Sequence, residues 1–208
     1  MRNSLLGVLV LLCSVTAVMA QPAERAATTF EEALLAKSRT MQTICCRFEQ
    51  TQSLAVLARE ITKPGRFYYV QPDRLALLFD DGDYIRMDAT AFAMKSGTVE
   101  TKRKIATNPM LKQLRRLLAG CMSGDFSLLT ADYSCQVEAE EGSWLVTLRP
   151  LRNRAAAHVS RIVMRFDAED LLLDELHMEQ PTGDFTRYRF YEKRINEPFD
   201  GALLEWRE

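Results

Sequence analysis

The sequence predicts an α+β domain built mainly on one antiparallel β-sheet. Short segments of alternating apolar and polar residues follow one another through most of the chain and are separated by turn residues, a pattern typical of antiparallel strands. Helical periodicity is confined to one stretch near the start and one near the middle. Residues 160–166 and 186–191 place apolar side chains on one face and mostly charged ones on the other. We therefore expect a sheet with one apolar and one wetted face, which indicates the α+β class.

The start of the chain has the features of a cleavable signal peptide. Arg2 supplies a positive charge, residues 5–18 are almost uninterruptedly apolar, and Val18-Met19-Ala20 fits the small-x-small cleavage rule. The apolar run is shorter than the roughly 20 residues that span a bilayer. Leu12 stands where a lipoprotein lipobox needs a small residue before Cys13. We expect residues 1–20 to be removed and residues 21–208 to form one exported domain.

Composition narrows the function classes. Hydrophobic residues make up 47% of the chain, which favours a packed core over disorder. The formal net charge of −1 gives no indication of a nucleic-acid partner. Cys45, Cys46, Cys121 and Cys135 remain after cleavage and allow three disulfide pairings, of which Cys121–Cys135 closes a short loop and is favoured. No spacing matches a redox pair or a zinc site.

The first half of the chain predicts one helix followed by strands. The helix is expected to begin with a cap at Thr28 or Thr29 and to end near Gln42. The strand 44–52 follows, then a looser segment 53–62. Lys63-Pro64-Gly65 is expected to form a turn. The strand 66–79 is expected to break or bulge at Pro72, because proline cannot donate to a ladder.

The second half predicts hairpins, a second helix and a run of strands. Asp80-Asp81-Gly82-Asp83 is a hairpin turn that returns as the strand 84–88, and Ser96-Gly97 turns a short hairpin. Asn108 and Pro109 are suited to cap and open a helix that ends at Gly120. Five strands are expected after it, over residues 133–139, 144–149, 159–167, 171–180 and 185–194.

The order and spacing of these segments resemble the LolA family of periplasmic lipoprotein carriers over nearly the whole mature chain. The helix leads into ICCRFEQTQ, similar to the family's F-x-Q strand at Phe48 and Gln50. KPGRFYYVQPDRLALLF is similar to the family segment around Gly65 and Pro72, and DGDYIRMD to its exposed turn. PTGDFTRYRFYEKRIN is similar to the closing strands. In the better-studied proteobacterial members an arginine precedes the proline and latches the lid. Here Gln71 stands in that place, and Arg74 is the nearest arginine.

The resemblance implies an open, incomplete antiparallel β-barrel, a strongly curved sheet whose apolar concave face is covered by lid helices. It implies a monomeric periplasmic carrier without a cofactor. The carrier would collect lipoprotein acyl chains from an inner-membrane ABC transporter and deliver them to an outer-membrane acceptor. The expected lipid-binding residues come from the apolar strand faces and from the second helix: Phe48, Phe67, Tyr69, Leu75, Leu77, Phe79, Leu114, Leu118, Met164, Phe166, Tyr188 and Phe190.

Other functions compete with that of a lipoprotein carrier. An enzyme is disfavoured because His158 and His177 have no nucleophile or carboxylate partner in the pattern, and no metal-ligand cluster or phosphate loop appears. A carrier of another lipid or pigment stays open. So does an envelope-stress sensor of the RseB type, although the second domain expected there does not follow. Lys102-Arg103-Lys104 and Arg115-Arg116 could contact a membrane or partner, but are more often a solvated face.

Overall fold

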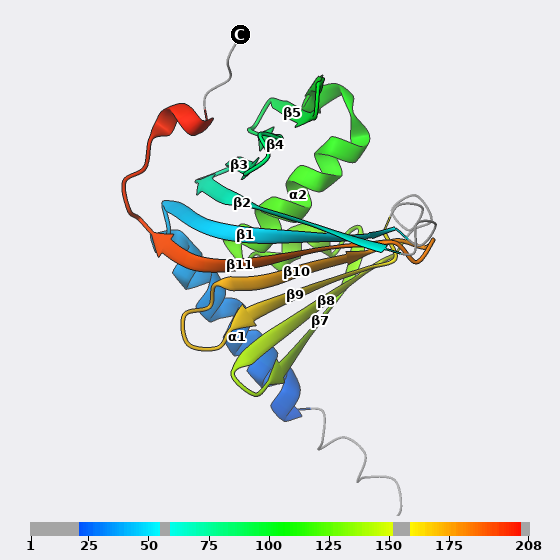
Figure 1. Cartoon of the computed structure of the whole chain (residues 1–208). Helices are drawn as coiled ribbons and strands as arrows, with labels where there is room; N and C mark the ends of the chain where they lie inside the picture. The colour runs from blue at the N-terminus through cyan, green and yellow to red at the C-terminus, as the bar shows by residue number, and fades with distance from the viewer. Residues whose placement is uncertain (1–20, 55–58, 152–158, 205–208) are drawn as a thin grey trace, which may run out of the picture.

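One large antiparallel sheet with two helices on one of its faces forms the molecule (Figure 1). The computed structural model describes residues 21–54, 59–151 and 159–204. The predicted signal peptide and His158 lie outside these residues. The sheet contains eleven strands in the order β6-β5-β4-β3-β2-β1-β11-β10-β9-β8-β7. The antiparallel α+β class predicted by the residue pattern is confirmed, and so is the open, strongly curved sheet with covering helices that the family resemblance implied.

The first helix is longer at its start than predicted. α1 spans Gln21–Thr40 and is already helical before Thr28 and Thr29, so the cap predicted there is wrong. The side-chain preference of threonine for a cap is weak compared with the continuous apolar face that α1 buries through Phe30, Leu34 and Met41. The strand predicted after it is confirmed as β1 (Thr43–Leu54).

The predicted long strand is a hairpin of two strands. β2 (Arg59–Val70) and β3 (Arg74–Phe79) pair antiparallel, with Tyr69 opposite Leu75. The break predicted at Pro72 is confirmed as the turn between them, where the Gln71–Pro72 peptide bond is cis.

The turn predicted at residues 63–65 is wrong, since these residues lie inside β2. Gly65 is needed there for space, because a Cβ atom on it would lie 2.7 Å from the Phe48 ring. Pro64 still contributes its carbonyl oxygen, which accepts a hydrogen bond from the amide of Asp80 at 3.1 Å. Tertiary packing therefore overrides a local turn signal at this point.

The next hairpins follow the prediction closely. β4 (Tyr84–Met87) returns after the turn at Gly82, and β5 (Ala91–Ser96) pairs with β6 (Val99–Lys104) around Gly97. Both glycines have positive φ angles, of 88° and 58°, which glycine adopts at little cost. β6 is the exposed edge of the sheet on this side.

The second helix starts as predicted and ends later. α2 spans Pro109–Ser123, and the side-chain oxygen of Asn108 accepts a hydrogen bond from the amide of Leu111 at 3.2 Å. Gly120 lies within α2, against Leu129, rather than at its end. The helix ends at Gly124, whose φ of 69° is the left-handed conformation typical of a helix C-terminus.

The last five strands are all confirmed, with small shifts at their ends. They are β7 (Tyr133–Glu140), β8 (Ser143–Pro150), β9 (Arg161–Asp167), β10 (Leu173–Glu179) and β11 (Phe185–Ile195). The last strand, β11, pairs with the first strand, β1. This pairing links strands β1 to β6 with strands β7 to β11. The sheet is therefore continuous from β6 to β7.

The main hydrophobic core lies between the concave face of the sheet and the two helices. It joins α1 residues such as Leu34, α2 residues such as Leu117, and inward-facing residues of most strands. A smaller cluster lies on the opposite face, where the 3₁₀ segment Gly201–Leu204 places Leu204 near Tyr68 and Cys45. The concave core is the part of the fold that positions the candidate site.

Candidate functional site

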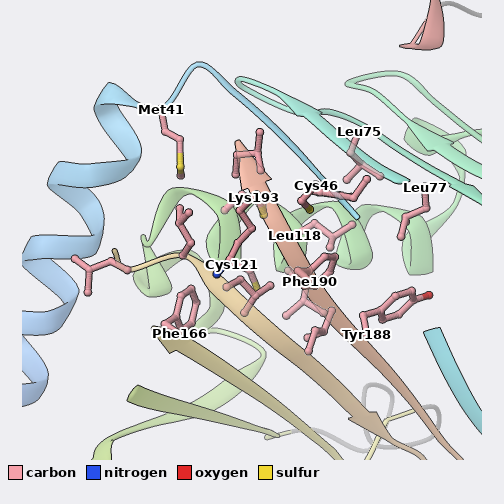
Figure 2. Close-up of a pocket in the computed structure, with 18 of the residues that line it drawn as sticks. Met41, Cys46, Leu75, Leu77, Leu118, Cys121, Phe166, Tyr188, Phe190 and Lys193 are labelled. Atoms are coloured by element: carbon pink, nitrogen blue, oxygen red, sulfur yellow. The ribbon is translucent and has the colours of Figure 1, made fainter. Parts of the chain in front are cut away.

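An apolar cavity of about 110 Å³ lies between the concave face of the sheet and the two helices. Figure 2 shows side chains of β1, β3 and β11 converging on it, with Leu118 and Cys121 of α2 on the helix side. Its volume is below the roughly 300–1,000 Å³ typical of small-molecule sites. The cavity in this structure is therefore smaller than a bulky apolar ligand needs.

Eight of the twelve predicted lipid-binding residues line this cavity. They are Phe67, Leu75, Leu77, Leu114, Leu118, Phe166, Tyr188 and Phe190. Tyr69 lies beside it, on a smaller hollow under α2. The structure thus brings together residues that are more than one hundred positions apart in the sequence. A role in binding lipid stays a prediction for each of them.

Phe48, Phe79 and Met164 lie in packed parts of the core, outside the cavity wall. Phe48 is fully buried, and its ring makes an edge contact with Phe79 at 5.2 Å between centroids. Met164 is also fully buried, in β9. Close packing alone accounts for the burial of these three side chains.

Sequence reasoning did not include thirteen of the residues that line the cavity. Twelve are apolar or sulfur-containing: Leu34, Met41, Ile44, Cys46, Leu117, Cys121, Met122, Leu171, Leu172, Leu173, Leu176 and Met178. The apolar faces predicted for the two helices include Leu34, Met41 and Leu117, so the sequence pattern could have identified these three residues. The thirteenth is Lys193, for which the strand alternation gave no signal.

The floor of the cavity is aromatic, and its polar groups are satisfied. The rings of Phe67 and Phe190 lie 5.5 Å apart, and those of Tyr188 and Phe190 lie 6.3 Å apart and nearly parallel. The side-chain amide of Gln50 donates to the hydroxyl of Tyr188 at 2.6 Å. Burial raises the pKa of Tyr188, which keeps this hydroxyl neutral. The floor therefore offers an apolar surface to a ligand.

Two side chains that directly follow strands β2 and β11 hold the C-terminal end of α1. The Gln71 amide donates to the carbonyl oxygen of Ser38 at 2.5 Å. Asn196 donates to the carbonyl oxygen of Thr40 at 2.8 Å and accepts from the amide of Gln42 at 2.7 Å. Gln71, the residue before Pro72, thus binds the backbone of α1 through a neutral hydrogen bond rather than a charge-assisted one.

The second helix is held by ion pairs at its surface. Arg115 lies 2.9 Å from Asp73 in the β2–β3 turn and donates to the carbonyl oxygen of Ala89 at 3.2 Å. Arg116 lies 3.1 Å from Asp132. Two of the basic residues considered for membrane contact therefore anchor α2 to the rest of the fold.

Cys45, Cys46, Cys121 and Cys135 are free thiols. The favoured Cys121–Cys135 disulfide is therefore not formed in this structure, although the two thiols lie close enough to raise the pKa of Cys121 electrostatically. Burial is the larger cause and raises the pKa of Cys121 to about 12. The pKa of Cys46 is likewise raised to about 12, mainly by burial. Both cavity thiols are neutral and behave as small apolar groups.

Groups suited to metal binding or to catalysis are sparse in the described parts of the chain. There, no group of three or more His, Cys, Asp or Glu side chains is placed to hold a metal ion. The ring of His177 packs on Phe185 at 4.9 Å between centroids, away from the cavity wall. Within the same residues, no helix has the length and apolar character to cross a membrane.

The fold and the cavity together define a class: an open antiparallel half-barrel with an apolar cavity between the sheet and its two helices. No protein-family model matches the chain, and no curated protein matches it in sequence.

Solved structures are similar to the chain. An uncharacterized conserved protein from Thermus thermophilus aligns with a TM-score of 0.50 and 8% identity, over 85% of this chain and 94% of that one. A DUF1329 family protein from Desulfovibrio piger aligns at 0.49 and 12% identity, over 87% and 96%. A LolA superfamily protein from Nitrosomonas europaea aligns at 0.42 and 8% identity, over 85% and 97%. At these identities the similarity concerns the fold alone.

Proposed function

We propose that this chain is a non-enzymatic periplasmic carrier that encloses lipid acyl chains between its sheet and its helices and ferries them from the inner to the outer membrane. Its cargo would be the acyl chains of lipoproteins or a related lipid. Collection from an inner-membrane ABC transporter and delivery to an outer-membrane acceptor belong to this proposal and rest on the family resemblance.

The lidded apolar cavity carries the proposal. Transfer of each CH₂ group out of water is worth about 0.8 kcal/mol, so an acyl chain of roughly 16 carbons costs on the order of 12 kcal/mol when exposed. A carrier must offset this cost and still release its cargo. The aromatic floor and the aliphatic inner face of α2 supply apolar area, and leucine and methionine side chains adapt to chains of varied shape.

The cover over the cavity is suited to opening. At its C-terminal end, α1 is held through neutral hydrogen bonds from Gln71 and Asn196, and α2 through exposed or half-exposed ion pairs. Contacts of these kinds each contribute roughly 1 kcal/mol or less. These polar contacts therefore add little to the cost of moving the helices. The larger cost is the loss of apolar contacts of residues such as Leu34 and Leu117, and burial of the acyl chain offsets it.

Mass spectrometry of an organic extract tests the proposal directly. The protein would be purified from the periplasm without detergent, and we expect near-stoichiometric lipid or lipoprotein acyl chains in the extract. A clean extract, together with no uptake of a fluorescent fatty-acid probe, would contradict a carrier function. It would leave a protein-binding or sensing role on the same fold.

A pair of variants tests whether the lipid binds in the cavity. Leu77→Glu introduces a charge into the cavity wall and should abolish lipid recovery. Val163→Glu makes the same change in β9, where alternation with the buried Ile162 and Met164 turns Val163 toward the opposite face of the sheet. Circular dichroism would verify that both variants are folded. Equal lipid recovery from both would show that the cavity is not the binding site.

A further inference from the structure

Lys193 is the charged residue in an otherwise apolar cavity wall. Among the described residues that line the cavity, every other side chain is aliphatic, aromatic or sulfur-containing. The Lys193 side chain is only 13% exposed, and Figure 2 shows it among the residues around the cavity. An ammonium group in such a place is costly unless it has an anionic partner.

A β-bulge delivers Lys193 to the cavity. Phe190 pairs with Phe48 and Tyr191 with Arg47, but the next matched pair is Arg194 with Cys45. Two residues of β11, Glu192 and Lys193, therefore lie opposite the single residue Cys46. Simple alternation from Tyr188 and Phe190 would point Glu192 inward and Lys193 outward. The bulge reverses this order, as bulges near functional sites do.

The bulge requires an unfavourable backbone conformation. Glu192 has a φ of 53°, a left-handed conformation that residues with a side chain rarely adopt. Such a conformation persists only where surrounding structure enforces it, and it is frequent at ligand sites. The bulge therefore costs conformational energy, and its result is that Lys193 lines the cavity.

The ammonium of Lys193 has an anionic partner at the rim, and the carboxylate of Asp167 is also close enough to feel its charge. Its Nζ donates to the carboxylate of Asp174, whose side chain is 40% exposed. The carboxylate therefore keeps its contact with water while the ammonium faces inward. An ammonium group has three donors, and Asp174 takes one of them. Burial raises the pKa of Cys46, a thiol of the cavity wall, and the nearby charge of Lys193 opposes that rise.

We propose that Lys193 binds the anionic end of an amphiphilic cargo, a carboxylate or a phosphate, while the acyl chain occupies the apolar cavity. This inference rests on the proposed function and narrows its cargo to lipids with a negatively charged polar end. The anion takes the donors of Lys193 that Asp174 leaves unused. Lipids with an uncharged polar end gain nothing from this contact.

Displacement of the uncharged fluorescent probe N-phenyl-1-naphthylamine from the full mature chain tests the proposal. Palmitate and hexadecanol share a chain length and differ in charge, as do a monoacyl phosphatidic acid and monopalmitoylglycerol. For wild-type protein we expect the anionic member of at least one pair to bind about tenfold more tightly, as hydrogen bonds to charged groups allow. The favoured pair identifies a carboxylate or a phosphate as the ligand group.

Three variants isolate the role of the charge. Lys193→Met keeps the length of the side chain and should reduce the ratio to about one, while the affinity for the neutral lipid is unchanged. Asp174→Asn removes the competing carboxylate and should increase the affinity for the anion. Lys63→Met is the matched control, because Lys63 is paired with Asp81 and Asp83 outside the cavity. It should leave the ratio at the wild-type value.

The outcomes separate this inference from the proposed function. A ratio near one in wild-type protein, or a ratio unchanged by both Lys193→Met and Asp174→Asn, would overturn the role of Lys193 while lipid binding stands. Failure of the probe and of all four lipids to bind would overturn the carrier function and this inference together.

Discussion

The two helices cover the same concave face in different ways. The middle of α1 packs closely on β8 and β9: Phe30 stacks on Trp144 at 4.9 Å and meets Phe166 edge-on at 5.6 Å. α2 instead contributes leucines and a methionine to the cavity wall, which also includes residues of β1, β3 and β11. We call the first area the packed region and the second the cavity region.

Strands in both regions alternate inward and outward side chains, but the inward side chains are buried to different degrees. In the packed region the inward residues of β8 and β9 are almost inaccessible to solvent: Val146, Leu148, Ile162 and Met164. In the cavity region inward residues such as Leu77 and Phe190 are only partly buried. The packed region stabilises the fold, so the cavity region can remain loosely filled without unfolding the chain.

Removal of an aromatic ring from the packed region should produce the largest effect. Phe30→Ala is expected to lower the free energy of unfolding by about 3–5 kcal/mol, because a large cavity forms where aromatic rings now fill the space. Urea denaturation measures this change. Leu114→Ala, on the cavity wall, should cost less because it enlarges an existing space. Equal losses would show that the two regions are not different in their packing.

A substitution at the contact between the helices should have an intermediate effect. Gly124 has a φ of 69°, and a Cβ atom there would lie 2.6 Å from Cγ of Leu34 in α1. Gly124→Ala should therefore lower the free energy of unfolding by about 2–4 kcal/mol, from the left-handed conformation and from the clash. It should also displace α1 and increase probe binding in the cavity.

Gly142→Ala is the matched control for this substitution. Gly142 has a φ of 72°, but a Cβ atom there would have nothing within 4 Å. It should carry only the conformational cost of about 1–2 kcal/mol and leave probe binding unchanged. If Gly124→Ala behaves in the same way as this control, α1 does not gate the cavity.

Loss of the latch should have the smallest effect on stability and a clear effect on dynamics. Gln71→Ala removes the hydrogen bond to Ser38 and should lower the free energy of unfolding by about 1 kcal/mol. Hydrogen exchange at the C-terminal end of α1 should become faster. Gln42→Ala, an exposed glutamine just beyond the same helix end, should not change it. Unaltered exchange in Gln71→Ala would assign the latch to Asn196 alone.

Local signals in the sequence predicted most of the fold. Strand alternation identified the inward faces of β3, β9 and β11, because the period of two is a property of the extended backbone itself. Asn108 and Pro109 marked the start of α2 because capping depends on adjacent residues. The same local signals failed at residues 63–65, where the need to fit Phe48 beneath Gly65 is set by another strand.

The sequence by itself determined which side chains share a face and that one sheet face is apolar. Only the tertiary structure decided where that face is packed and where it encloses a cavity, because this depends on how far each helix stands from strands distant in the sequence. The position of Lys193 was decided in the same way. The bulge at Glu192 arises from the pairing of β11 with β1, nearly 150 residues earlier in the chain. One extra residue in a strand turns each later side chain to the opposite face of the sheet.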